Sequence, residues 1–106
     1  MTIQYDPGTR TLRAEISGEI DHHRAAALRS ELDAALYTHT PAVLLLDLSG
    51  LSFMDSSGIG LIMGRYRILH PLGGEIILQN PPPHITRLLR LAGMERLASI
   101  RQEVRS

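Results

Sequence analysis

The chain of 106 residues contains no cysteine, and its 11 basic residues are all arginine. Without cysteine there are no disulfides, no thiolate metal ligands and no thiol nucleophile. Without lysine there is no Gly-Lys pair of the kind that phosphate-binding P-loops require. Aromatic residues make up only 4% of the chain, few for a protein that stacks single-stranded nucleic acid. Several large function classes are therefore excluded from the start.

Net charge is also lacking, because 11 acidic residues balance the 11 arginines. A binder of nucleic acid or of an anionic membrane needs a basic excess, so we expect neither partner. Residues 1–6 show no basic start and apolar run of a signal peptide, and no apolar stretch approaches the roughly 18 residues of a membrane span. We expect one cytoplasmic domain over residues 1–106, since domains commonly have about 100–150 residues.

Hydrophobic periodicity predicts the elements of secondary structure. Alternation of apolar and polar residues indicates strands, and leucines four residues apart indicate a helix. The predicted elements are strands at residues 2–5 and 12–16, a helix from Asp21 through Leu36, a buried strand at 42–48, a loop at 49–57, a helix between Ser57 and Pro71, a strand at 75–79, a helix after Pro83, and a strand at 97–100. In the second helix the apolar stripe runs through Ile59 and Ile62, and Arg65 is placed away from it.

This order, β-β-α-β-α-β-α-β, predicts an α/β fold with a mixed, mostly parallel sheet. The opening hairpin adds one antiparallel strand. Functional groups of such sheets gather at the carboxyl ends of the strands, where the chain enters the helices. Two segments meet that description, residues 18–23 (Gly-Glu-Ile-Asp-His-His) and residues 54–60 (Met-Asp-Ser-Ser-Gly-Ile-Gly). We expect the function to reside there.

The segment from Asp55 to Gly60 opens a helix directly after a strand. Asp55 and the serines are good helix caps, and the free amides of a helix N-terminus would offset the charge of a phosphate esterified to Ser56 or Ser57. Gly58 and Gly60 would let a partner's backbone approach closely. The alternative is that Asp-Ser-Ser only caps the helix and the glycines only permit close packing.

Enzymatic motifs are incomplete in this region. A nucleophile elbow requires glycine two residues before the serine, where Met54 precedes Ser56. A dinucleotide fingerprint requires glycine at position 63, which is methionine. His22 and His23 are adjacent and diverge by about 100° on a helix, so they do not face one metal centre. Glu19 and Asp21 form a small acidic edge. We therefore expect neither an enzyme nor a metal site.

The stretch from Leu46 to Gly60, continuing through residues 64–66 (Gly-Arg-Tyr), resembles the anti-sigma factor antagonists of the STAS domain family. Residues 18–23 resemble the matching segment of the sporulation-type antagonist, which acts on the forespore sigma factor. Gly73-Gly74-Glu75, the helix after Pro83 and residues 91–94 follow the same pattern in order. The resemblance covers nearly the whole chain. It departs at the C-terminus, where the family's last helix is expected to be short or missing.

By this resemblance Ser56 is the phosphorylated serine, and Asp21 and Asp55 are the acidic residues beside it. The partner-binding residues are then Glu19, Asp21, His22, Asp55, Ser56, Ser57, Gly58 and Gly60. The implied partner is an anti-sigma factor that is also a serine kinase of the histidine-kinase-like ATPase fold. That kinase supplies ATP, so the chain has no cofactor of its own, and a metal-dependent serine phosphatase reverses the modification.

Phosphorylation would abolish binding to the anti-sigma factor, whereas the unphosphorylated form would bind it and release the sigma factor. Two other functions stay open at this point. The domain could bind a small anionic ligand or a nucleotide at the serine loop, or it could belong to a larger signalling assembly without anti-sigma control.

Overall fold

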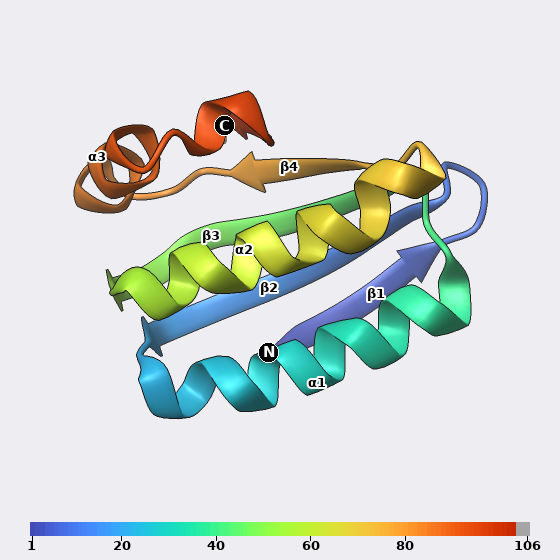
Figure 1. Cartoon of the computed structure of the whole chain (residues 1–106), viewed down its shortest axis with the longest axis horizontal. Coiled ribbons are helices and arrows are strands. Elements are labelled where there is room, and N and C mark those ends of the chain that lie inside the picture. The colour runs from blue at the N-terminus through green and yellow to red at the C-terminus, as the bar shows by residue number, and fades with distance from the viewer. Residues whose placement is uncertain (104–106) are drawn as a thin grey trace.

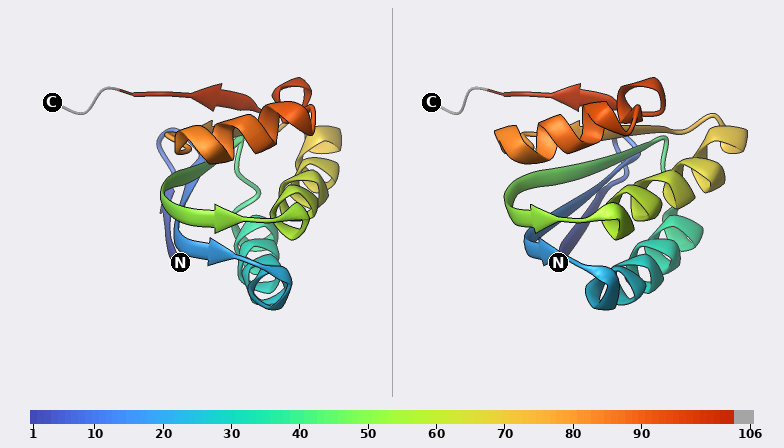
Figure 2. Two further views of the ribbon diagram at one scale, coloured as in Figure 1. Left: turned by 90° about the vertical axis from the view of Figure 1, so that its left-hand side faces the viewer. Right: turned by 60° about the vertical axis from the view of Figure 1, so that its left-hand side comes forward.

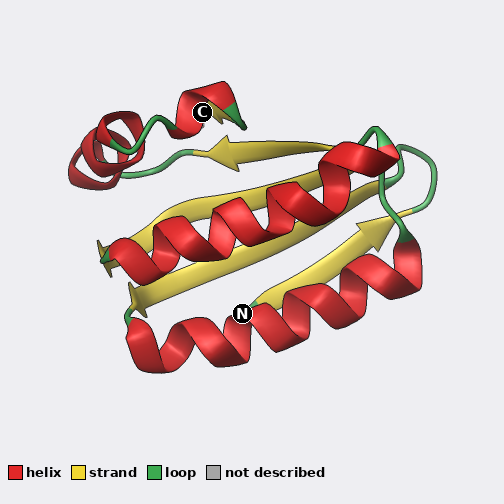
Figure 3. Cartoon of the chain, viewed as in Figure 1, coloured by secondary structure: helices red, strands yellow, loops and turns green. Residues whose placement is uncertain are grey.

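Five strands form one sheet in the order β1-β2-β3-β4-β5 in the computed structural model, which describes residues 1–103. Strand β1 is antiparallel to β2, and the remaining neighbours are parallel. The elements are β1 (Thr2–Asp6), β2 (Thr11–Ile20), α1 (His22–His39), β3 (Val43–Met54), α2 (Ser56–Leu69), β4 (Glu75–Gln79), α3 (Pro83–Leu91) and β5 (Ser99–Arg101), with short 3-10 turns at His70–Leu72 and Met94–Arg96. The predicted fold class and element order are confirmed (Figure 3).

Helices α1 and α2 lie side by side on one face of the sheet (Figure 1). Helix α1 buries Leu28, Leu32 and Leu36, the leucines whose spacing predicted it. They pack against alternate strand residues such as Leu12 and Leu44, which are fully buried. Figure 2 shows the helix layer and the sheet layer edge-on. Burial of apolar area between these two layers provides the main stabilisation of the domain.

Strand β3 is longer than the predicted strand, and residues 49–54 are not the loop that their polarity indicated. The strand pairs with β2 as far as Ile20 opposite Met54. Two register shifts, between Glu15 and Ser17 and between Gly18 and Glu19, interrupt the pairing. Such bulges break the period-two pattern from which a strand is recognised in sequence. The two long strands therefore carry the chain past the end of β4 to the predicted functional edge.

The C-terminal part agrees with prediction in its order and differs in its bounds. Pro83 is the first residue of α3, and Gly93 follows the helix in the left-handed region at φ 75°, as expected of a residue just past a helix end. The last strand is Ser99–Arg101 instead of the predicted 97–100, so it begins two residues later and includes Arg101. The expectation of a short or missing final helix rests on residues 101–106, of which 104–106 lie outside the described residues.

Arg65 is buried, contrary to the prediction that it lies away from the apolar stripe of α2. Its side chain keeps 6% of its exposure, and Nε lies 2.9 Å from Oδ1 of Asp33 on α1. A carboxylate on the neighbouring helix thus supplies the counter-charge that an interior guanidinium needs. Over residues 1–103 no helix has both the length and the apolar character to cross a bilayer.

Candidate functional site at the helix N-termini

The ends of β2 and β3 lie next to each other and hold the candidate site. Ile20 and Met54 are register partners, and the backbone N–H of Asp55 donates to the carbonyl of Ile20 at 3.2 Å. Each strand is followed at once by an aspartate and a helix, so the N-termini of α1 and α2 emerge side by side (Figure 1). The structure thereby brings together the two segments that the sequence marked separately.

Each of these helices is capped by an aspartate side chain. Oδ1 of Asp21 accepts a hydrogen bond from the backbone N–H of Arg24 at 2.9 Å, and Oδ1 of Asp55 accepts one from Ser57 at 2.8 Å. Both aspartates have extended backbone and are partly buried. The predicted helix start at Asp21 is confirmed, with Asp21 as its cap, and the predicted cap at Asp55 is its counterpart on α2. Each carboxylate thus satisfies an amide of the helix end and leaves negative charge at the edge.

Ser56 is the first residue of α2 and its side chain is exposed. Among residues 1–103 its hydroxyl has no hydrogen-bond partner, whereas Ser57 is half-buried and lies against the other helix. A hydroxyl in this position is open to a phosphoryl donor. The amides of Ser57 and Gly58 are already bonded to Asp55, so the positive end of the α2 helix dipole, and not a set of free amides, is what favours a phosphate on this residue.

The two glycines of α2 differ in their surroundings. A Cβ atom on Gly58 would lie 2.2 Å from Cγ of Met54, so Gly58 lets the helix pack directly on the end of β3. A Cβ atom on Gly60 would meet nothing within 4 Å, and Gly60 is exposed. The alternative that the glycines only permit close packing therefore applies to Gly58. Gly60 instead leaves open space on the surface.

Glu19 is exposed at the end of β2, and its backbone is held by a residue that the sequence did not single out. The Nη1 of Arg24 donates to the carbonyl of Glu19 at 2.8 Å and also to that of Ser17. The hydroxyl of Ser52 donates to the carbonyl of Gly18 at 3.1 Å, and Gly18 has a positive φ of 79°. These contacts fix the end of β2 opposite the bulges of β3, so the acidic edge is held in place before any partner arrives.

His22 lies at the start of α1 and lines a groove between α1 and α2. Its ring meets that of His23 edge to face with centroids 6.1 Å apart. Three predicted partner-binding residues, His22, Ser57 and Gly60, line this groove. Its other members were not predicted from the sequence, and they are Ala25, Ala26, Arg29 and Leu61. Ala25, Ala26 and Arg29 follow His22 by three, four and seven residues and Leu61 follows Ser57 by four, and this spacing was the available signal because residues so spaced share one helix face.

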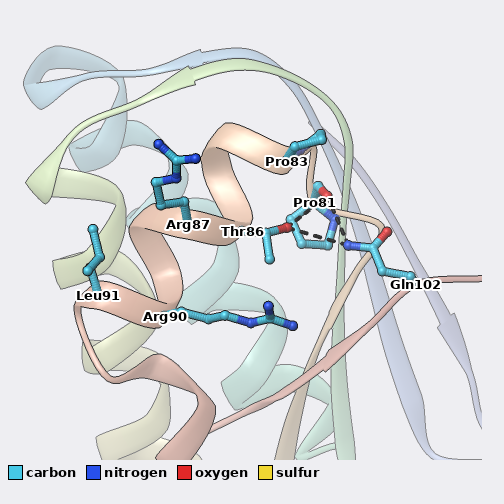
Figure 4. Close-up of a pocket in the computed structure, with 7 residues that line it drawn as sticks. All are labelled: Pro81, Pro83, Thr86, Arg87, Arg90, Leu91 and Gln102. Carbon is cyan, nitrogen blue, oxygen red and sulfur yellow. Dashed lines mark hydrogen bonds between the residues drawn. The ribbon is translucent and has the colours of Figure 1, made fainter.

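A second cavity, of about 560 Å³, lies beside α3 and contains none of the predicted site residues (Figure 4). Two of its polar side chains bond within the chain, since Thr86 Oγ1 and Gln102 Nε2 donate to the carbonyl of Pro81 at 3.1 and 3.0 Å, and Arg87 and Arg90 also line it. Because the residues predicted from the sequence gather at the helix N-termini and none of them lines this cavity, we place the functional site at the helix N-termini.

A family model described as the STAS domain matches residues 3–106. The chain belongs to the STAS domain family. Two bacterial relatives carry the name anti-sigma F factor antagonist. The protein of Lysinibacillus sphaericus is 39% identical over 95 residues, 89% of this chain and 81% of the relative. The protein of Paenibacillus polymyxa is 34% identical over 100 residues, 94% of this chain and 86% of the relative.

Two solved structures of a STAS relative show the same fold at 31% identity. One is the anti-sigma factor antagonist SpoIIAA in its unphosphorylated form, with a TM-score of 0.81 over 97% of this chain and 89% of that chain. The other is the Bacillus cell fate determinant SpoIIAA in the phosphorylated form, with a TM-score of 0.74 over 97% of this chain and 92% of that chain. The single α/β domain described above is therefore the fold of that relative.

Proposed function

We propose that this STAS domain is an anti-sigma factor antagonist whose binding is switched by phosphorylation of Ser56. The observation that carries the proposal is the exposed Ser56 hydroxyl at the first residue of α2, beside the capping carboxylates of Asp21 and Asp55. The names of the two bacterial relatives support the antagonist role. Glu19, His22, Ser57 and Gly60 complete the proposed contact surface, and the buried Gly58 supports it through its packing on Met54.

The proposed modification requires no catalytic group in this chain. Ser56 Oγ attacks the γ-phosphorus of ATP held by the partner, the new O–P bond forms, and the bond to the β-phosphate oxygen breaks to give ADP. The hydroxyl proton passes to a base of the kinase. In this proposal the kinase has the histidine-kinase-like ATPase fold, and a metal-dependent serine phosphatase hydrolyses the ester in the same cytoplasmic compartment. The chain itself is a regulator and not an enzyme.

The phosphate carries about −1.5 to −2 charges at neutral pH. In the free domain the positive end of the α2 helix dipole offsets part of that charge, so the fold persists. The relative solved in a phosphorylated form supports this point, since this chain matches its fold with a TM-score of 0.74. In a complex the same dianion lies in a closed interface beside Asp21 and Asp55. An uncompensated charge there costs several kcal/mol, equivalent to about a hundred-fold or greater loss of affinity.

Binding and phosphorylation assays with the purified anti-sigma factor of the same organism test the proposal. The wild-type chain should bind and incorporate one phosphate per chain in the presence of ATP. Ser56→Ala should bind and incorporate none, and Ser57→Ala is the matched control that still incorporates phosphate. Full phosphorylation of Ser56→Ala, or equal affinity of the phosphorylated and unphosphorylated wild type, would overturn the proposal.

A further inference from the structure

The groove between α1 and α2 opens directly beside the proposed phosphorylation site. It has a volume of about 340 Å³. Its lining residues on α1 are His22, Ala25, Ala26 and Arg29, and those on α2 are Ser57, Gly60 and Leu61. Ser57 is the neighbour of Ser56, so any protein that covers Ser56 also meets the mouth of this groove. An inference that the groove binds the partner therefore rests on the proposed function. It adds which part of this chain's surface the partner contacts.

The shape of the groove comes from its small residues. Ala25 and Ala26 present only methyl groups from α1, and Gly60 presents no side chain from α2. A Cβ atom on Gly60 would meet nothing within 4 Å, so the space above it is unfilled by the chain's own side chains. An aliphatic side chain of another protein can therefore enter between the helices without displacing any group of this domain.

The charge of the groove comes from Arg29. Asp33, one turn further along α1, is engaged by the buried Arg65 at 2.9 Å. In the part of the chain that the structure describes, no carboxylate lies within ion-pair distance of Arg29. Burial is the largest cause of the lowered pKa of Arg65. The positive charge of Arg29 lowers this pKa further, which shows that the two guanidinium groups interact electrostatically. Asp33 thus pairs with Arg65 and not with Arg29, which leaves the positive charge of Arg29 uncompensated at the groove.

We propose that this groove receives a segment of the anti-sigma partner in which an aliphatic side chain packs over Gly60 and a neighbouring Asp or Glu pairs with Arg29. Charge complementarity argues for the acidic residue, because Arg29 is the permanently charged group of the lining. The absent side chain at Gly60 argues for the aliphatic one. An acidic segment seated beside Ser57 also explains why a phosphate on Ser56 repels the partner, since both groups are negative.

The shape requirement is tested by a matched pair of glycine variants. Gly60 and Gly64 lie one turn apart on α2, and a Cβ atom on either meets nothing within 4 Å, but Gly64 does not line the groove. Gly60→Leu should lower affinity for the purified anti-sigma factor at least ten-fold, and Gly64→Leu should change it less than two-fold. Urea unfolding of both variants should show a fold at least as stable as wild type, because glycine in a helix interior is itself unfavourable.

The charge requirement is tested at Arg29, with Arg67 as the matched control because it is an exposed arginine of α2 outside the groove lining. Arg29→Glu should lower affinity at least ten-fold and Arg29→Gln about three-fold or more, whereas Arg67→Glu should stay within two-fold. The difference between wild type and Arg29→Gln should shrink as salt rises, since exposed ion pairs are screened. Arg29→Gln is included because a glutamate at position 29 could disturb α1 by repelling Asp33, whereas glutamine removes the positive charge without adding a negative one.

The outcomes distinguish failure of the groove proposal from failure of the proposed phosphorylation switch. Wild-type affinity in Gly60→Leu and Arg29→Gln, with affinity still lost on phosphorylation of Ser56, would overturn the groove and leave the switch intact. Absence of binding by the wild-type chain would overturn both. Sedimentation of the chain alone is the remaining measurement: a dimer that Arg29→Glu dissociates would show that a second copy occupies the groove, which contradicts the assignment to the partner.

Discussion

The carboxylate of Asp33 on α1 lies 2.9 Å from Nε of Arg65 on α2 and joins the two helices that carry the candidate site. The contact is an ion pair without good hydrogen-bond alignment, and Nη1 of Arg65 is buried with no hydrogen-bond partner among the described residues. Burial lowers the pKa of Arg65, while Asp33 opposes that lowering. The guanidinium is thus held inside the domain by one carboxylate.

Removal of that carboxylate should destabilise the domain strongly. Asp33→Ala leaves Arg65 as an uncompensated interior charge, and breaking a buried pair in this way costs about 3–5 kcal/mol. We expect about 3 kcal/mol, at the lower end of that range, because the Asp33 side chain is 29% exposed and water can partly replace it. Urea unfolding at pH 7 measures the loss. The loss should be constant around neutral pH, because a base with a lowered pKa alters stability only where it begins to lose its proton.

The double variant Asp33→Ala/Arg65→Met separates the charge effect from loss of packing. Methionine keeps the aliphatic part of the arginine side chain without its charge, so the double variant should regain most of the stability that Asp33→Ala loses. Equal instability of the single and double variants would mean that packing, and not the unpaired guanidinium, causes the loss.

The close contact of Gly58 with Met54 predicts a second stability effect. In Gly58→Ala the new methyl would lie 2.2 Å from Cγ of Met54, so the methionine or the helix must shift. Overpacking of this kind costs on the order of 1–3 kcal/mol. Gly64→Ala, whose methyl meets nothing within 4 Å, should instead stabilise the chain by about 0.5–1 kcal/mol. Thermal melts of the two variants that shift in the same direction would contradict this difference.

Much of the fold could be predicted from local pattern. Leu28, Leu32 and Leu36 have helical spacing and are all buried, and Asp21 has the residue type and position of a cap and forms one. The placement of the serine loop after a strand also followed from local order, because carboxyl ends of parallel strands share one edge. These features depend on neighbours within about one helical turn, which a single sequence displays directly.

Features that depend on distant residues could not be predicted. Arg65 was placed away from the apolar stripe because an isolated arginine is usually exposed, and only Asp33, on another helix, permits its burial. The end of β3 was taken for a loop because bulges opposite Ser17 and Glu19 break its alternation. The groove at Gly60 and Arg29 exists only because α1 and α2 lie side by side.

The cap at Asp55 allows its structural role to be separated from its charge. Asp55→Ala loses the hydrogen bond to the Ser57 amide and should lower stability by about 1 kcal/mol. Asp55→Asn keeps an oxygen that accepts this bond, so its stability should stay close to that of wild type. Urea unfolding of the two variants measures the difference. An Asn variant as unstable as the Ala variant would show that the carboxylate charge, and not the hydrogen bond, stabilises the start of α2.

The proposed switch acts at an interface, so negative charge at position 56 should leave the free domain folded. Ser56→Asp places a carboxylate at the first residue of α2, where the helix N-terminus favours it by about 0.3–1 kcal/mol and the neighbouring Asp55 partly opposes it. We expect the free energy of unfolding to change by less than about 1 kcal/mol, with partner affinity reduced. The contrary outcome is a Ser56→Asp variant whose loss of partner affinity is proportional to its loss of stability. The negative charge would then act by unfolding α2 and not by repelling the partner.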